Sequence, residues 1–255
     1  MQQFNALLTS HIDLQLYILI GIAICYILAH QYRTNSILRY VDVCLNYIPV
    51  LTHEFGHILF NKISGGRAKD LVIVVSPTER EQTLQQGYAV TSSASRLSQI
   101  ITTLGGYIMP PLMLYIGVLT IKHDYASLFV GAYILIFIYF LFLTSRKVMP
   151  LIILIILAGL LYFIFQYHQD LLTSQLISIV IHYILGVLLG EVLQSSWTIM
   201  RLTFNSRITE WDGSALRDLT HLPVICFSVL WIAINLYTLY TVWNVLSITQ
   251  PYFQS

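Results

Sequence analysis

One apolar segment, residues 40–62, carries an H-E-x-x-H pattern formed by His53, Glu54 and His57. On a helix, the two histidines lie one turn apart on the same face, and Glu54 projects about 100° around the axis from His53. Imidazoles at this spacing can bind one metal ion, and Glu54 can reach a water bound to that metal. These polar groups are costly in an apolar helix unless they have partners. The pattern therefore predicts a buried metal site, and the rest of the chain must fold around it.

The residues around the pattern strengthen this prediction, because H-E-x-x-H alone also occurs by chance. The flanking sequence includes Pro49, Leu51, Ile58 and Phe60, and is apolar enough for a helix in lipid. Gly56 leaves the backbone bare beside the histidines. We expect this bare backbone to give a substrate strand room to approach.

The composition predicts a polytopic membrane protein. Of the 255 residues, 56% are hydrophobic and 10% are charged, whereas soluble domains carry about 25% charged residues. The mean hydropathy of +0.72 agrees. A net charge of +1 gives no sign of a nucleic-acid partner. Residues 1–13 lack the basic residues of a cleavable signal, so we expect the first apolar segment to be a retained span.

The three cysteines, Cys25, Cys44 and Cys226, are scattered through apolar runs and form no C-x-x-C pair. We expect them to be buried small side chains without a disulfide.

The chain is expected to form one all-α transmembrane domain, residues 1–255, with about seven transmembrane helices. The predicted spans are residues 14–30, 40–62, 97–121, 125–143, 148–167, 176–199 and 222–246. Between spans two and three, residues 67–92 combine β-branched runs with a polar turn, which predicts a short β-hairpin. Because free strand edges are not tolerated in lipid, this hairpin should lie at the interface or in a protein-lined cavity.

Basic residues predict the orientation of these spans in the cell membrane. Of the 13 lysines and arginines, ten lie on the side of the N-terminus and of the loops after spans two, four and six, and three lie on the other side. This distribution places the N-terminus, the hairpin and the segment around Asp212 in the cytoplasm. His57 and Asp212 then lie at a similar depth near the cytoplasmic face.

A catalytic zinc site needs three protein ligands and one open position for water. Asp212, in a predicted loop at residues 201–218, is our choice for the third ligand. Gly213 follows it, and an Asp-Gly turn can direct a carboxylate into a cleft. Four other residues remain candidates for this position: Asp218, His221, Glu191 and His182. The role of Glu191 and His182 stays open, since Glu191 could equally join a hydrogen-bond network with Gln194 and Ser195.

The charges of this set balance. Zn²⁺, two neutral histidines and the carboxylates of Asp212 and Glu54 sum to zero, which greatly reduces the cost of placing charges in a low-dielectric cavity.

Four features together resemble the site-two protease superfamily, and more closely its compact bacterial metallopeptidase-like branch without a PDZ or CBS domain. They are the H-E-x-x-H span, the hairpin after it, Gly106-Tyr107-x-x-Pro110 in the next span and Trp211-Asp212-Gly213 before a late span. The resemblance implies an intramembrane zinc metalloendopeptidase with one Zn²⁺ per chain and a transmembrane protein or peptide as substrate. Asp212 matches the third zinc ligand of that superfamily.

In such an enzyme Glu54 would act as general base. The hairpin around Val72 and Tyr88 could hold an unwound substrate strand by edge addition. Pro110 and Asn235 could open or line a channel, or could simply form a helix kink and an interhelical hydrogen bond. Two other functions fit the sequence: a catalytically inactive zinc-binding scaffold, and an ion or solute transporter that uses the polar residues of span six.

Overall fold

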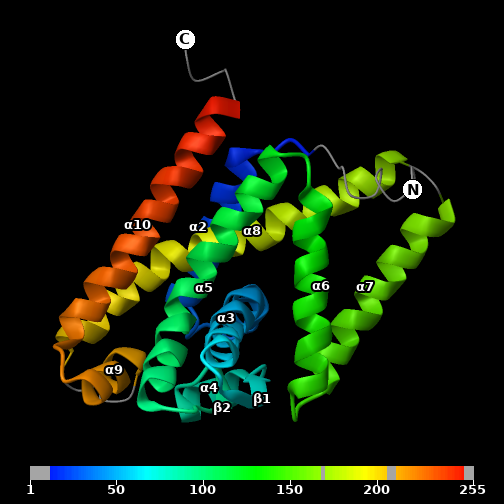
Figure 1. Ribbon diagram of the computed structural model, residues 1–255. Helices are drawn as coiled ribbons and strands as arrows, with labels where there is room; N and C mark the ends of the chain where they lie inside the picture. Colours follow the sequence, from blue (N-terminus) through cyan, green and yellow to red (C-terminus); the bar gives the residue numbers. More distant parts are fainter. Residues whose placement is uncertain (1–11, 168–169, 206–210, 250–255) are drawn as a thin grey trace.

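The computed structural model describes residues 12–167, 170–205 and 211–249. These parts of the chain form a mostly helical protein with one small sheet (Figure 1). The elements are α2 (Leu16–Gln31), α3 (Leu38–Ile63), β1 (Arg67–Ile73), α4 (Pro77–Thr83), β2 (Gly87–Ser92), α5 (Arg96–Lys122), α6 (Ala126–Leu143), α7 (Val148–Tyr167), α8 (Asp170–Phe204), α9 (Asp212–Thr220) and α10 (Val224–Thr249).

Four of the described helices are long and apolar enough to cross a membrane. They are α5, α6, the Gln175–Phe204 part of α8 and the Val224–Leu246 part of α10. Two further apolar segments, α2 and Val148–Gly159 in α7, are shorter. These helices indicate a multi-pass membrane protein. Each of the seven expected spans corresponds to a helix, whereas the number that crosses the membrane stays a prediction.

The helix with the H-E-x-x-H pattern, α3, is not among those four, because polar residues interrupt its apolar sequence. Figure 1 shows α3 in the middle of the protein, between α5 and α6 and above the small sheet. It contacts α2, α5, α8 and both strands. Asp42, Asn46 and Asn61 on α3 are at most 3% exposed. The surrounding protein therefore shields the polar groups that would be costly in lipid.

The predicted hairpin between α3 and α5 is confirmed. β1 and β2 pair antiparallel, with Val72 opposite Tyr88. Their connection is more than a turn, because it contains helix α4. Ser76 caps this helix by accepting a hydrogen bond from the Glu79 backbone N–H, and Pro77 occupies its first turn.

The hairpin is anchored to the link between α6 and α7. The Ser145 backbone N–H donates to the Asp70 carboxylate at 2.8 Å. The Arg146 guanidinium donates two hydrogen bonds to the Glu79 carboxylate, at 2.6 and 2.8 Å. The Arg146 charge lowers the pKa of Glu79 through these bonds.

Much of the loop predicted at residues 201–218 is helical. Helix α8 continues to Phe204, and α9 begins at Asp212 itself. Residues 206–210 lie outside the described ranges. The predicted span ends at residue 199, where the strongly apolar sequence ends. Helix α8 continues past this residue through polar positions such as Arg201.

The expectation of buried cysteines is wrong. Cys25, Cys44 and Cys226 are unpaired, as predicted, but their side chains lie on exposed helix faces. In a membrane protein the outer face of a helix is apolar as well, so an apolar neighbourhood in the sequence does not distinguish a lipid-facing position from a core position.

Candidate metal centre

The two histidines of α3 direct their Nε2 atoms to the same point. These atoms lie 3.2 Å apart. On the far side of the His57 ring, Nδ1 lies 2.9 Å from the backbone carbonyl of Thr102 on α5. Because a carbonyl only accepts, Nδ1 carries a proton, so in the neutral ring Nε2 is the atom that offers its lone pair to a metal. This second partner fixes the ring orientation in the way that is usual for metal-binding histidines.

Asp212 reaches the same point from the start of α9. Its Oδ2 atom lies 3.4 Å from Nε2 of His53 and 3.4 Å from Nε2 of His57. Among the described residues, these three form the one group of at least three His, Cys, Asp or Glu side chains that could hold a metal ion.

The size of this triangle fits a zinc ion. Ligand atoms about 2.0–2.1 Å from a tetrahedral zinc are separated from one another by about 3.3–3.4 Å. The observed separations are 3.2, 3.4 and 3.4 Å. A tetrahedral ion bound to these three atoms would keep a fourth position for water, as catalytic zinc sites do.

Burial alone would raise the pKa of Asp212. When the His57 and His53 rings are protonated, their positive charge and hydrogen bonding outweigh this effect and hold the pKa of Asp212 below its ordinary value. Asp212 is therefore a carboxylate, the form that binds a metal.

Glycines bring α5 close enough to complete the site. A Cβ on Gly56 would lie 2.4 Å from the Gly105 carbonyl oxygen, so α3 and α5 approach through bare backbone. Gly56 therefore faces α5, and the expectation that a substrate strand approaches there is wrong. A Cβ on Gly106 would lie 2.4 Å from Nε2 of His57 and 2.7 Å from Nε2 of His53.

Aromatic rings position α9. The ring of Tyr107 lies edge-on against His53, with centroids 4.8 Å apart, and also contacts the rings of Trp211 and Trp231. Trp211 folds over Gly213, where a Cβ would lie 2.5 Å from its ring. Gly213 is therefore needed for ring packing in the first turn of α9, and not for the Asp-Gly turn that the sequence suggested.

The other end of α9 is held by Arg96 at the start of α5. Its Nε donates to the Leu219 carbonyl at 2.6 Å, and its Nη2 lies 3.1 Å from the ring of His221. Together with the tryptophan contacts, this arrangement fixes both ends of the helix that carries Asp212.

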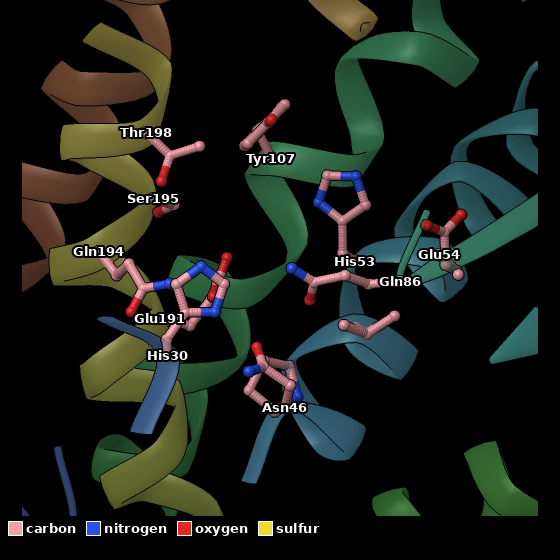
Figure 2. A pocket seen from close by; sticks show the side chains of 13 residues that line it. His30, Asn46, His53, Glu54, Gln86, Tyr107, Glu191, Gln194, Ser195 and Thr198 are labelled. Atoms are coloured by element: carbon pink, nitrogen blue, oxygen red, sulfur yellow. The ribbon is translucent and has the colours of Figure 1, made fainter. Parts of the chain in front are cut away.

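Glu54 follows His53 on α3 and lies beside the triangle. Its side chain is buried against β2, where a Cβ on Gly87 would lie 3.2 Å from Glu54 Cγ. Glu54 and His53 line one wall of a cavity of about 190 Å³. Figure 2 shows α8 forming the opposite wall, with Glu191, Gln194 and Ser195, while Gln86 lies on the Glu54 side.

The other candidates for the third ligand have partners elsewhere. Asp218 pairs with Arg217 on the surface, and His221 contacts Arg96. His182 accepts a hydrogen bond from the Gln15 backbone N–H at 2.9 Å, so it serves the packing of α8 against the chain before α2.

Of the four residues suggested for substrate guiding, Val72 is fully buried and its cross-strand partner Tyr88 is partly exposed. Pro110 is buried within α5. Asn235 donates to Val192, Ser195 and Ser196 on α8, so it connects α10 to α8.

Sequence reasoning missed several contributors to this region. Thr102 acts through its carbonyl, which no sequence pattern reveals. Gln86 lines the cavity but belongs to no recognisable sequence motif. Gly106 belongs to the Gly106-Tyr107-x-x-Pro110 stretch, and this stretch was the available signal for the close approach of α5.

The fold and the site together define a class: helical membrane proteins with a partly buried His-His-Asp site that fits a metal. The family described as Peptidase M50B-like matches residues 18–242, and the chain belongs to this family. Membership agrees with the resemblance to site-two proteases, and M50 peptidases are in general zinc metalloproteases. Searches among curated proteins and among solved structures gave no significant match.

Proposed function

We propose that this protein is an intramembrane zinc metalloendopeptidase that hydrolyses peptide bonds of membrane-embedded proteins near the cytoplasmic face. The observation that carries the proposal is the triangle of His53, His57 and Asp212, whose edges match a tetrahedral zinc site. Membership of a peptidase family supports the same reaction class. One zinc ion per chain is expected.

The proposed roles of the residues follow from their positions. A bound zinc ion would polarise the scissile carbonyl and lower the pKa of its water. Glu54, one residue from His53 and lining the same cavity, takes the proton of that water and delivers it to the leaving amine. The hydrogen bond between His57 and Thr102 keeps the imidazole oriented.

The substrate must be unwound before cleavage, because a helix buries its carbonyls in intrahelical hydrogen bonds. The two-stranded sheet offers an edge to which such a segment could add. β2 packs directly against Glu54, so a strand added at the hairpin around Val72 and Tyr88 would be led toward the cavity.

The test compares wild type with Glu54→Gln, purified in detergent and also expressed in cells. The variant is expected to fold and to hold zinc as wild type does, while membrane-protein fragments found with wild type disappear. Equal fragment patterns with an intact zinc content would contradict a protease and would favour a zinc-binding scaffold.

A further inference from the structure

A buried chain of polar groups lies next to the cavity and has no part in the proposed reaction. It joins Glu191 on α8, Tyr26 on α2, and Asn46 and Asp42 on α3. The Tyr26 hydroxyl contacts both Asn46 Oδ1, at 2.6 Å, and Glu191 Oε2. Tyr26, Asn46 and Asp42 are at most 3% exposed. Counting protons along this chain determines the charge of Glu191.

The hydrogen bonds around Asp42 determine whether this carboxyl carries a proton. Arg33 Nη1 lies 3.3 Å from His30 Nε2, and since arginine only donates, that nitrogen accepts. His30 is then neutral, and its Nδ1–H donates to Asp42 Oδ1 at 3.0 Å. Asn46 Nδ2 donates to the same oxygen. Arg80 Nη1 lies 3.8 Å from Asp42 Oδ2. With two donors and a nearby cation, Asp42 is ionised.

The remaining protons follow from this assignment. Asn46 gives its amide N–H to Asp42, so it presents its carbonyl to Tyr26, and Tyr26 donates its only proton to that carbonyl. The Tyr26 oxygen must then accept from Glu191, which is therefore a neutral carboxylic acid. Reversing the Asn46 amide would require a protonated Asp42 beside Arg80 and His30, which is the less favourable arrangement.

A neutral Glu191 changes the character of the cavity. The wall opposite Glu54 then consists of uncharged hydrogen-bonding groups, contributed by Glu191, Gln194, Ser195 and Thr198 on α8. His30 and Asn46, which also line the cavity, are neutral as well. The cavity has a volume of about 190 Å³.

We propose that this cavity is a substrate subsite for an uncharged hydrogen-bonding side chain, such as that of Ser, Thr, Asn or Gln, beside the scissile bond. Glu191 is the neutral acid that binds it. This proposal rests on the proposed function. An aliphatic side chain would leave the polar wall unpaired. Binding of a basic side chain would require Glu191 to ionise and Tyr26 to break its hydrogen bond to Asn46. An acidic side chain would be repelled by the Glu54 carboxylate in the same cavity.

The first experiment measures the protonation of Glu191 without any need for activity. Infrared spectra of the purified protein should contain the C=O band of a buried protonated carboxyl, and Glu191→Gln should remove it. Glu81→Gln, the same substitution at an exposed position of α4, is the matched control and should leave the band unchanged. A band that survives Glu191→Gln would overturn the proposal.

The second experiment measures which residues the protein prefers beside the cleaved bond, with a library of peptides from a digested proteome. Cleavage that also occurs with Glu54→Gln is subtracted as background. Wild type is expected to favour uncharged polar residues over basic ones about tenfold or more at one position beside the cleaved bond, the scale of one hydrogen bond. Tyr26→Phe removes the hydroxyl oxygen that accepts the Glu191 proton, so the neutral acid loses a hydrogen bond and cleavage at basic residues should rise relative to uncharged ones. If Tyr26→Phe does not fold, Glu191→Leu should likewise lose the preference.

The outcomes are distinguishable. Glu54-dependent cleavage with a preference for basic or aliphatic residues overturns the subsite and leaves the peptidase standing. The absence of all Glu54-dependent cleavage overturns the peptidase and the subsite together, while the infrared band still decides the charge of Glu191.

Discussion

Replacing Gly106 by alanine should weaken zinc binding strongly without unfolding the protein. The new methyl group would lie 2.4 Å from His57 Nε2 and 2.7 Å from His53 Nε2, whereas ordinary contacts begin at 3.4 Å. The His57 ring must therefore move by about 1.0 Å and the His53 ring by about 0.7 Å. Zinc–ligand distances tolerate about 0.2 Å. Both ligand atoms are thus displaced several times further than a zinc site allows.

The cost should fall on zinc and not on the fold, because the groups in contact are the ends of side chains that can rotate away. We expect zinc affinity to drop by about 100-fold or more, the upper end of the effect of disturbing groups around a metal. Competition with a chelator measures this affinity, and thermal unfolding of the zinc-free protein measures the stability of the fold.

Gly131→Ala on α6 is the matched control, since a Cβ there has nothing within 4 Å. It should keep both zinc and stability. Undiminished zinc affinity in Gly106→Ala would contradict this prediction, because the histidine nitrogens could not then lie so close to Gly106 on α5.

Three further predictions concern interactions that hold the helices and the hairpin together. Arg96→Ala should lower zinc affinity about tenfold in chelator competition, because α9 loses two contacts that hold it in place. Asn235→Ala should lower the free energy of unfolding by about 1–3 kcal/mol with zinc content unchanged, since its bonds join α10 to α8. The exposed Arg146–Glu79 pair should contribute below about 1 kcal/mol. Because the pair lowers the pKa of Glu79, its contribution to stability is fully present above the ordinary glutamate pKa. The contribution is lost as the pH falls through the lowered pKa of Glu79. Unfolding of wild type and Arg146→Ala, measured at several pH values, would show this loss.

Local patterns in the sequence predicted the elements that depend on neighbouring residues. The H-E-x-x-H helix follows from its apolar flanks, and the hairpin follows from two β-branched runs around polar residues. Asp212 was chosen for a turn that does not form, yet the structure places its carboxylate beside both histidines. The actual cause is tertiary: Trp211, Tyr107 and Arg96 position α9.

Contacts between distant helices could not be predicted in the same way. Gly56 was assigned to a substrate because the sequence does not show that Gly105 packs against it. The contact between Tyr26 and Glu191 joins residues 165 positions apart, and no periodicity connects them. The exposed cysteines show the same limit, because apolar sequence around a residue in a membrane protein marks either the core or the lipid face.

The most direct test of the metal centre is zinc X-ray absorption on the purified protein, compared with Asp212→Asn. We expect one zinc per chain, bound by two imidazoles and by oxygen ligands at about 2.0–2.2 Å, with no sulfur. Asp212→Asn should alter the oxygen shell and weaken binding. A sulfur ligand, or a spectrum unchanged by Asp212→Asn, would contradict a site built from His53, His57 and Asp212.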